Sequence, residues 1–458
     1  MGAGVYPTGR SGPDRAGTGA GRQGALASSS QRLPPLMDLT VHIWVPIALG
    51  IVVLFLLLLT WSSRRTLASN LRPAFDAGIE ELLPNLAELT GGEIQEGNRA
   101  RVLQNGDAFF AALLEDVARA TVSVHFETYV WWQGEITHRL AEALAAKARE
   151  GLAVRLILDA HGSMSMEPAV AQTLDEGGCR VCYFHRFRLR DLGKLNSRDH
   201  RKLAVIDGRV AYLMGHGVAE QWTGNARDES EFRDTAVRLE GPIVRDVQSL
   251  FLRNWLTVND EIVIAPEDFP PLEPAGEVKA HLAASAPAGY FSEVELLYKV
   301  AISAARESIL IQNPYFVPHE SVVDLLVQAA ARGVDVRIML PRKTDSRLVR
   351  HASHVFYGDL LRGGVHLYEY QKTFAHQKVM VVDGVWSHIG STNFDHRSLQ
   401  INYEVAVGML DRGVAEELKA AFEEDLESSA EVSYEGWRRR RFWRRVGDNL
   451  AYLIREQI

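Results

Sequence analysis

The stretch His376-Gln377-Lys378-Val379-Met380-Val381-Val382-Asp383 decides the fold of this 458-residue chain, because its frame occurs a second time. His200-Arg201-Lys202-Leu203-Ala204-Val205-Ile206-Asp207 has the same order of a His, any residue, a Lys, four apolar residues and an Asp. Of the 15 histidines, only His200 and His376 are followed by a Lys two residues later. In both copies a glycine follows the Asp, and a short turn of small residues comes seven residues after it. Two coincidences of this length indicate an internal duplication.

The residue types in the repeated frame suit chemistry on a phosphodiester. In an extended segment, a His and a Lys at positions i and i+2 point to the same face, and the apolar run after them is typical of a buried strand. The ammonium group neutralises phosphate oxygens while the imidazole attacks phosphorus or delivers a proton. One copy supplies a nucleophile without an acid, whereas two copies facing each other across a pseudo-twofold axis supply both.

The two stretches resemble the paired HKD motifs of the phospholipase D superfamily, and their longer context is similar to bacterial cardiolipin synthases. Much of the resemblance lies after the second copy, in Gly390-Ser391-Thr392-Asn393-Phe394-Asp395-His396-Arg397-Ser398 and in Asn402-Tyr403-Glu404. Glu127-Thr128-Tyr129 and Asn313-Pro314-Tyr315-Phe316, which precede the two motifs, also match. The similarity runs from about Gly97 to the C-terminus.

The resemblance implies a role for each His and Lys of the two motifs. His200 is expected to be the nucleophile that forms a phosphohistidine, while His376 acts as the general acid and then as the general base. The residues alone leave the two histidines nearly interchangeable. Lys202 and Lys378 are expected to hold the phosphate oxygens.

The small-residue turns after the two motifs differ. Asn393 and Ser391 of the second turn are expected to help bind the phosphate, whereas the first turn has Gly217 where the second has Asn393. One phosphate-binding amide is therefore missing from the first half. Either a backbone amide replaces it or the site is asymmetric. Both His-Lys pairs are present, so we expect activity.

Four carboxylates accompany the motifs. Family members place an acid after the small-residue turn to hold the imidazole in one tautomer, and Glu404 and Asp234 occupy those places. A longer insertion separates Asp234 from its turn. Asp207 and Asp383 end the buried strands of the two motifs, where a catalytic role and a charge-balancing structural role are both open.

Strands and helices alternate in both halves of the chain. The pattern predicts helices at 107–119 and 136–149 and strands at 122–131 and 154–159, and the second half repeats the order. This alternation predicts an α/β fold of two similar halves related by pseudo-twofold symmetry, each a mixed, mostly parallel sheet flanked by helices, plus an N-terminal transmembrane helix. The predicted parts are a disordered tail at 1–40, a transmembrane helix at 41–62, a helical connector at 63–96, a first phospholipase D-like domain at 97–262, a proline-rich linker at 263–290, a second phospholipase D-like domain at 291–435 and a basic aromatic helix at 436–458.

An apolar run near the N-terminus predicts a membrane anchor. The run from Ile43 to Trp61 contains no charged residue and has a tryptophan near each end, as expected of a helix that spans a bilayer. No small-residue cleavage site follows cleanly, which disfavours a signal peptide. Arg64, Arg65 and Arg72 follow the run. The positive-inside bias therefore favours a single-pass protein of the bacterial inner membrane with its catalytic region in the cytoplasm.

Composition narrows the function classes. The formal net charge of -8 disfavours a general nucleic-acid binder. The two cysteines, Cys179 and Cys182, lie among apolar residues that predict the core of a strand. The histidines and cysteines lack metal-ligand spacing, and two lysines already meet the phosphate charge, so we expect neither a metal nor another cofactor.

Two basic stretches leave alternatives open. Residues 186–198 contain five Lys or Arg residues before the first motif and are either a solvated loop or a collar for anionic lipid headgroups. Residues 437–445 combine tryptophans with arginines. That composition is typical of an interfacial helix on anionic lipid, with nucleic-acid binding as the alternative.

Together these features predict a membrane-bound phosphatidyltransferase. By resemblance, one phosphatidylglycerol donates its phosphatidyl group to the enzyme, glycerol leaves, and a hydroxyl of a second phosphatidylglycerol releases cardiolipin. The alternatives are a phospholipase D-type hydrolase, a membrane-tethered phosphodiesterase or nuclease, and a catalytically silent scaffold. No motif His or Lys is lost, which disfavours the scaffold. Phospholipid substrates and an anionic membrane surface are the expected partners, and no nucleic acid is expected.

Overall fold

The computed structural model describes residues 44–54, 75–90, 92–185, 196–286, 292–440, 442–453 and 455. The chain falls into two compact units, 1–64 and 65–458, which we describe separately. In the first unit, residues 44–54 form a helix whose side chains are exposed. The tail predicted at 1–40, the remainder of the predicted transmembrane helix at 41–62 and most of the basic stretch 186–198 lie outside the described residues. Among the helices that the structure describes, none is both long and apolar enough to cross a membrane.

The second unit begins with helix α2 (Ile79–Leu89) and then alternates strands with helices in two successive series. The first series is β1 (Gln95–Gln104), α3 (Asn105–Arg119), β2 (Ser123–Thr128), α4 (Glu135–Arg149), β3 (Ala153–Asp159), α5 (Pro168–Glu176), β4 (Arg180–Phe184), β5 (Leu203–Ile206), β6 (Val210–Met214), η3 (Glu220–Trp222), β7 (Thr235–Glu240) and α6 (Ile243–Asn259). The second series is η4 (Pro266–Asp268), β8 (Val278–Ser285), α7 (Glu293–Ala304), β9 (Ser308–Gln312), β10 (Phe316–Val317), α8 (Glu320–Ala331), β11 (Asp335–Pro341), α9 (Arg347–Arg362), β12 (His366–Tyr370), β13 (Val379–Val382), β14 (Trp386–Gly390), β15 (Phe394–Asp395), η5 (Arg397–Ile401), β16 (Glu404–Leu410), α10 (Arg412–Glu427), β17 (Ser429–Glu431), α11 (Tyr434–Arg438) and α12 (Phe442–Leu453).

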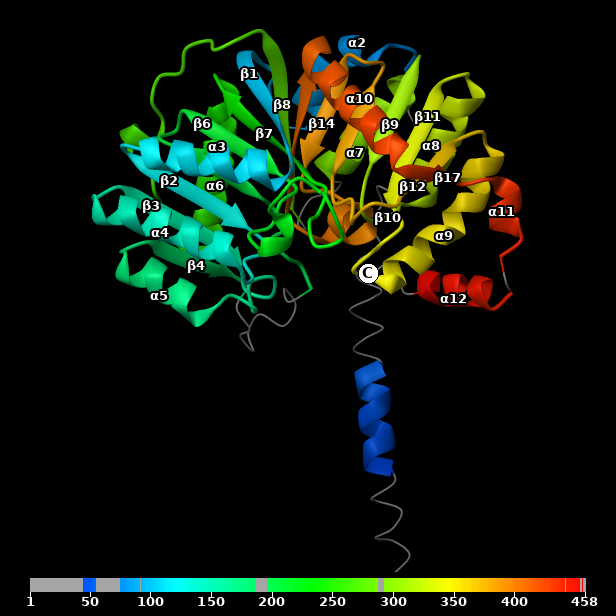
Figure 1. Cartoon of the computed structure of the whole chain (residues 1–458), viewed down its shortest axis with the longest axis horizontal. Coiled ribbons are helices and arrows are strands. Elements are labelled where there is room, and N and C mark those ends of the chain that lie inside the picture. Colours follow the sequence, from blue (N-terminus) through cyan, green and yellow to red (C-terminus); the bar gives the residue numbers. More distant parts are fainter. Residues whose placement is uncertain are drawn as a thin grey trace, which may run out of the picture. The chain divides into compact units, whose positions relative to one another are not determined.

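Among the described residues of this unit, fifteen strands form one mixed sheet (Figure 1). The strand order is β1-β7-β6-β5-β2-β3-β4 in the first half and β8-β16-β14-β13-β9-β11-β12-β17 in the second, with β1 paired to β8 in the middle. Counting outward from that pair, β5 of the first motif and β13 of the second occupy the same position. This order is the one expected of two similar halves related by a pseudo-twofold axis.

The prediction of a mostly parallel sheet is wrong, because only the strand–helix–strand units give parallel pairs. β2, β3 and β4 are parallel to one another, as are β9, β11 and β12, whereas the other neighbouring strands within each half pair antiparallel. Each motif strand is joined to the next by a tight turn, at Asp207-Gly208 and at Asp383-Gly384, in which both residues have positive φ. Such turns reverse the chain and produce an antiparallel pair.

The stretch predicted as a proline-rich linker, 263–290, contains a strand. β8 pairs with β16 from Lys279 to Ser285 and with β1 at Val278 and Ala280, and so joins the two halves into one sheet. Its sequence, Val278-Lys279-Ala280-His281-Leu282-Ala283-Ala284-Ser285, has few of the β-branched and aromatic residues that mark a strand. Pairing on both sides, rather than local propensity, holds it extended.

In the described part of the second unit, three hydrophobic clusters form the core. One belongs to the first half and includes residues of α3, α4 and α5, and one belongs to the second half and includes residues of α7, α8 and α9. The third contains residues of both halves, among them those of α6 and α10. The prediction that both cysteines lie in the core of a strand holds only in part, because Cys182 lies in β4 but is half-buried, and Cys179 is buried but lies just before the strand. The shared cluster holds the halves together, which allows their motif segments to meet.

Candidate active site

Each motif begins in an extended segment that leads into a buried strand at the centre of its half. His200 and Lys202 precede β5, and His376 and Lys378 precede β13; every residue of both strands is buried. Lys202 Nζ donates to the carbonyl of His200 at 2.9 Å, and Lys378 Nζ donates to that of His376 at 2.6 Å. Each lysine therefore lies beside the histidine that precedes it by two residues.

Backbone hydrogen bonds between the halves bring the two motifs together. The N–H of His200 donates to the carbonyl of Tyr403 at 2.9 Å, and the N–H of His376 donates to that of Arg233 at 2.7 Å. Tyr403 and Arg233 each stand directly before a carboxylate residue in the sequence. Each histidine is thus held next to an acid of the other half.

The side chains complete this crossed arrangement. The two carboxylate oxygens of Glu404 lie 2.9 and 3.0 Å from Nδ1 of His200, and Oδ2 of Asp234 lies 2.6 Å from Nδ1 of His376. Both acids are fully buried. A carboxylate at Nδ1 favours a proton there, so Nε2 of each ring is left for attack at phosphorus or for proton transfer. The sequence predicts both acids as partners of the imidazoles, but not that the pairs cross between the halves.

The two acids receive a further hydrogen bond from different side chains. Ser391 Oγ donates to Glu404, whereas Trp222 Nε1 donates to Asp234 at 2.9 Å. Gly215 stands in the first turn where the second has Ser391, and a Cβ there would lie 2.1 Å from Oδ1 of Asp234. The first turn has no room for a side chain, so the indole takes the place of the hydroxyl.

Burial makes both imidazoles neutral near pH 7. Together with the charge of Lys378, it lowers the pKa of His376 to about 3, against the opposing effect of Asp234. Burial likewise lowers the pKa of His200, against the opposing effect of Glu404. A neutral imidazole keeps the lone pair on Nε2 that a nucleophile or a base requires.

Burial also lowers the pKa of the two lysines. The pKa of Lys202 falls to about 8 and that of Lys378 to about 7, although the nearby carboxylates oppose the shift. Lys378 Nζ lies 2.9 Å from each ring nitrogen of His376. An ammonium group in this place can bind an anion that approaches Nε2, and the anion in turn raises the pKa of the lysine.

Comparison with known proteins relates this site to a family. The family model described as "Cardiolipin synthase, PLD-like domain" matches residues 298–426. Cardiolipin synthase 2 of Bacillus anthracis is 34% identical over 379 residues, which cover 82% of this chain and 74% of the relative. The major cardiolipin synthase ClsA of Bacillus subtilis is 34% identical over 388 residues, which cover 84% of this chain and 80% of the relative. The chain belongs to the phospholipase D-like cardiolipin synthase family.

A solved structure agrees with this family assignment at the level of the fold. The crystal structure of phosphatidylserine synthase from Haemophilus influenzae Rd KW20 superposes with a TM-score of 0.60 at 12% sequence identity. The match covers 83% of this chain and 99% of that chain. The family model and the two cardiolipin synthase relatives confirm the resemblance predicted from the paired HKD motifs.

The aspartates that end the two HKD motifs follow β5 and β13, whereas the histidines precede these strands. Asp207 accepts hydrogen bonds from the backbone N–H groups of residues 121–123, and Asp383 accepts them from residues 306–308. Both have a φ of 53°. Each carboxylate ties the turn after its motif strand to the start of the neighbouring strand, β2 or β9. Of the two roles that the sequence left open, this geometry favours the structural one.

The two turn residues predicted to bind the phosphate differ in their surroundings. Ser391 donates to Glu404 and accepts from the N–H of Val405 at 3.1 Å, so its hydroxyl holds an acid in place. Asn393 is buried, and its Oδ1 has no hydrogen-bond partner within the described part of the chain. A contact with a phosphate oxygen would have to come from Nδ2 of Asn393, because Oδ1 accepts and does not donate, so the phosphate contact stays a prediction.

Four aromatic residues of the described chain contact the imidazoles: Tyr129 lies at His200, and Trp222, Phe232 and Phe374 lie at His376. The ring of Tyr129 lies 5.1 Å from that of His200, and the ring of Trp222 lies 5.2 Å from that of His376. Tyr129 belongs to the Glu127-Thr128-Tyr129 segment that the family resemblance singles out. Trp222 was missed because it lies in the insertion between the first turn and Asp234, where no motif marks it. Its proximity to the acid arises only in the folded chain.

Proposed function

We propose that this member of the cardiolipin synthase family makes cardiolipin from two molecules of phosphatidylglycerol and releases glycerol. The observation that carries the proposal is the pair of imidazoles, each with an acid of the other half at Nδ1 and a lysine beside it. Such a site holds both the nucleophile and the proton donor of a double displacement at phosphorus. The relatives named above, which are cardiolipin synthases, support the choice of substrate.

In the first step, Nε2 of His200 attacks the phosphorus of one phosphatidylglycerol. A phosphorus–nitrogen bond forms and the phosphorus–oxygen bond to the glycerol headgroup breaks. His376 gives its Nε2 proton to the departing glycerol oxygen, so free glycerol leaves. Lys202 and Lys378 stabilise the negative charge of the non-bridging oxygens during the transfer.

In the second step, His376 has become neutral and acts as a base. It takes a proton from a headgroup hydroxyl of the second phosphatidylglycerol, and that oxygen attacks phosphorus and displaces Nε2 of His200. Cardiolipin leaves, and both histidines return to their starting states. One residue serves first as acid and then as base because the second step reverses the proton transfer of the first.

The substrate itself supplies the protonation that His376 needs in the first step. In the unliganded site, burial and Lys378 hold the pKa of His376 to about 3. A bound phosphodiester brings a negative charge that offsets the repulsion from the lysines, which raises the pKa of His376. Asp234, 2.6 Å from Nδ1, then stabilises the imidazolium.

We further propose that the chain is a single-pass protein of the bacterial inner membrane with its catalytic region in the cytoplasm. The supporting features are the uncharged run from Ile43 to Trp61 and the arginines Arg64 and Arg65 that follow it. The basic aromatic segment at the C-terminus supports a second contact with the membrane surface. Both keep the site near its lipid substrates.

The experiment that tests the proposed function is a product analysis with purified full-length protein in mixed micelles of phosphatidylglycerol. Cardiolipin and glycerol should form in equal amounts with the wild type, and neither should form with His200→Ala. Phosphatidic acid and glycerol without cardiolipin would show that water is the acceptor, and would make the protein a phospholipase D-type hydrolase. A folded wild-type protein that forms none of these products would contradict the proposal for phosphatidylglycerol.

A further inference from the structure

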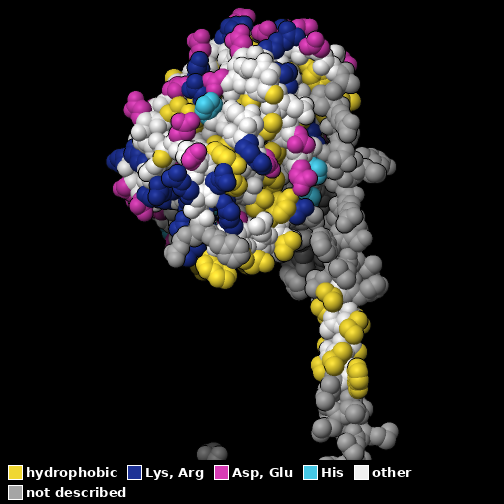
Figure 2. All heavy atoms as spheres, turned by 90° about the vertical axis from the view of Figure 1, so that its right-hand side faces the viewer, with side chains coloured by type: hydrophobic (Ala, Val, Ile, Leu, Met, Phe, Trp, Pro, Cys, Tyr) yellow, Lys and Arg dark blue, Asp and Glu magenta, His cyan; other side chains and the backbone are white. Residues whose placement is uncertain are grey.

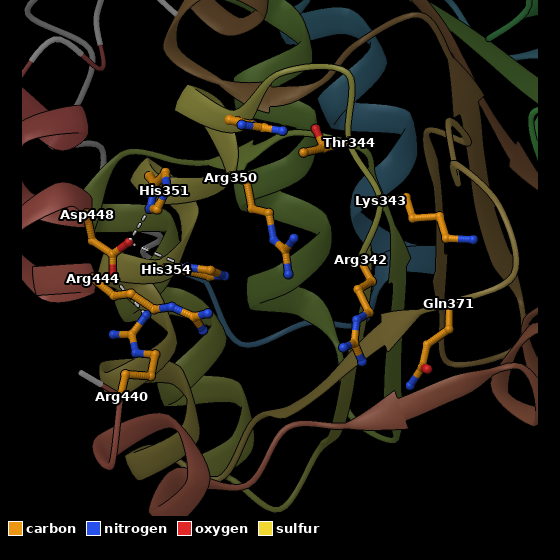
Figure 3. A pocket seen from close by; sticks show the side chains of 11 residues that line it. Arg342, Lys343, Thr344, Arg350, His351, His354, Gln371, Arg440, Arg444 and Asp448 are labelled. Atoms are coloured by element: carbon orange, nitrogen blue, oxygen red, sulfur yellow. Dashed lines mark hydrogen bonds and ion pairs between the residues drawn. The ribbon is translucent and has the colours of Figure 1, made fainter. Parts of the chain in front are cut away.

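A pocket lies between α9 and α12, and none of the residues that line it belongs to the HKD motifs. Its volume of about 760 Å³ is in the range of small-molecule sites. Figure 3 shows Arg350 between two groups of side chains, one near the ends of β11 and β12 and the other on α9 and the C-terminal segment. Six cationic side chains line the pocket: Arg342, Lys343, Arg347, Arg350, Arg440 and Arg444.

The sequence spacing of the lining residues brings them to one side of each helix. On α9 they are residues 347, 350, 351 and 354, which recur at the three- and four-residue intervals of a helix face. In the C-terminal segment they are Arg444 and Asp448, which are four residues apart on α12, and Arg440, which lies just before that helix. The cationic stripe of α9 therefore faces Arg440 and Arg444, an arrangement that costs energy unless negative charge lies between them.

The pocket is a built structure rather than a chance gathering of surface residues. Trp437 packs so closely on α9 that a Cβ at Gly358 would lie 2.4 Å from its ring, and its Nε1 donates to the carbonyl of His354 at 3.2 Å. Arg440 stacks on Trp437 at 4.5 Å and donates to the buried carboxylate of Asp448 at 2.8 Å. These contacts fix the C-terminal segment against α9.

The pocket has a surplus of positive charge after its internal ion pairs are counted. Lys343 pairs with Glu229 at 2.6 Å, Arg350 lies 3.6 Å from Glu369, and Arg440 is bound to Asp448. The remaining cations, Arg342, Arg347 and Arg444, have no carboxylate within 4.0 Å among the described residues. The whole chain carries a net charge of -8, so this surplus is a local feature. It fits a ligand with a phosphate group.

A metal ion fits this pocket less well. His351, His354 and Asp448 could supply three ligand atoms that lie within 4.8 Å of one another. Asp448, however, is already neutralised by Arg440. Burial opposes protonation of His354, but its hydrogen bonds with Asp448 and Glu369 outweigh that effect and raise its pKa, which favours the cationic ring over a metal ligand. The surrounding arginines would also repel a divalent cation.

An apolar edge beside the pocket indicates that the phosphate belongs to a lipid. Trp443, Leu450 and Leu453 of α12 are 76%, 60% and 69% exposed. Figure 2 shows the side of the molecule on which α9 and α12 lie, where Lys and Arg side chains gather above hydrophobic ones. A helix with a cationic face and an exposed apolar face is typical of a segment that lies in a membrane interface. A free phosphate ion has no apolar part that could contact this edge, whereas a phospholipid has acyl chains.

We propose that the pocket between α9 and α12 binds the phosphate headgroup of an anionic phospholipid, outside the catalytic centre, with the acyl chains along the apolar edge of α12. The site takes a second lipid molecule in addition to any substrate at the histidines. The loop between β11 and α9, which lines the pocket, also carries Asp345. Asp345 accepts a hydrogen bond from Tyr315 of the Asn313–Phe316 segment. The pocket is therefore connected through this loop to a segment near the second HKD motif.

The test uses the full chain in a neutral detergent and a phosphatidylglycerol with a photoreactive group in its headgroup. Cross-linked peptides identified by mass spectrometry should include residues 342–354 and 440–448. Replacing the three unpaired arginines, in the variant R342A/R347A/R444A, should reduce labelling of these peptides by about tenfold or more. The three side chains are exposed, so the variant should keep the wild-type melting temperature.

The charge-matched control is R438A/R439A/R445A, which removes three arginines of the basic segment 437–445 but leaves the pocket lining intact. It should change labelling by less than about twofold. Equal loss in both triple variants would show diffuse attraction to surface charge and would overturn the proposal. Displacement of the label by an equal concentration of inorganic phosphate would assign the pocket to free phosphate and overturn the lipid assignment. Labelling that requires added divalent metal would also overturn it.

Discussion

The backbone N–H of His200 and that of His376 make equivalent hydrogen bonds to the other half, but different side chains surround the two imidazoles. Glu404 at His200 is fixed by the hydroxyl of Ser391, whereas Asp234 at His376 is fixed by the indole of Trp222. The pKa of His376 falls to about 3, with Lys378 as the second cause after burial. Lys378 contacts the ring of His376 through both nitrogens.

The comparison shows which contacts are the same in the two halves and which differ between them. The crossed contacts between each histidine and the acid of the other half occur twice, because each depends on a backbone pair next to the motif. The side chain that donates a hydrogen bond to the acid differs between the halves, because any N–H or O–H group within reach can satisfy a buried carboxylate. The tighter contact between lysine and imidazole in the second half gives that half the more electropositive surroundings. These surroundings suit the role proposed for His376, which is neutral in the free enzyme and becomes protonated when an anionic substrate binds.

The largest expected effect comes from removing either histidine. His200→Ala should lower kcat by about 10⁴-fold or more, because the covalent route is lost, and His376→Ala by about 10²- to 10⁴-fold. A phosphodiester with a nitrophenol leaving group needs no acid for departure, so His376→Ala should still form the phosphohistidine with it. Intact-mass spectrometry of the quenched enzyme detects the adduct.

The same experiment can reverse the assignment of the two histidines. An adduct that forms in His200→Ala and maps to His376 would show that the second half supplies the nucleophile. A covalent adduct on neither histidine in the wild type would contradict the double displacement itself.

The next effect concerns the acids. Glu404→Gln and Asp234→Asn should each lower kcat by about 10³- to 10⁴-fold, because an amide no longer fixes the proton on Nδ1 or stabilises the imidazolium. Imidazole nitrogen resonances should show that Glu404→Gln perturbs His200 and leaves His376 nearly unchanged. The exposed Glu423→Gln on α10 is the control and should leave kcat unchanged. If Glu404→Gln perturbed His376 instead, the crossed pairing would be wrong.

The sequence predicts the chemistry of the site better than its geometry. The His-Lys spacing, the acids Glu404 and Asp234, and the α/β class all follow from residue types and order. The antiparallel pairing of the motif strands was missed, although Asp207-Gly208 and Asp383-Gly384 carry a turn signal. β8 was missed because its alanine-rich sequence depends on pairing with strands far away in the chain.

The third prediction is that the charge of Lys378 sets the alkaline limit of kcat/KM. The pKa of Lys378 is lowered to about 7, so its charge is present below that pH and is lost as pH rises through it. Loss of this charge weakens phosphate binding, and kcat/KM should fall by about tenfold per pH unit above neutrality. Lys378→Arg keeps its charge, so the alkaline limb should move to that of Lys202, whose pKa is about 8. If kcat/KM of the wild type stayed constant from neutral to strongly alkaline pH, the lowered pKa of Lys378 would be contradicted.

The fourth prediction compares the two donors to the acids. Ser391→Ala and Trp222→Phe each remove one hydrogen bond to a buried carboxylate, and each should lower kcat by about tenfold with little change in KM. Gly215→Ser puts a hydroxyl where the other half has one, but its Cβ would meet Asp234 at 2.1 Å, so its kcat should fall further than that of Trp222→Phe. Normal activity of Gly215→Ser would show that the first turn can adjust to the arrangement of the second.

The smallest effect on activity is expected at the last residue of each motif. Asp207→Asn and Asp383→Asn weaken the hydrogen bonds to the backbone of residues 121–123 and 306–308, and each should lower the free energy of unfolding by about 2 kcal/mol. Well below the melting temperature, kcat should stay within about threefold of the wild type, because neither carboxylate contacts a motif histidine or lysine. Thermal unfolding and kcat measured on the same preparations separate the two roles. A fall in kcat of about 100-fold without a change in melting temperature would mean that these aspartates act on the chemistry after all.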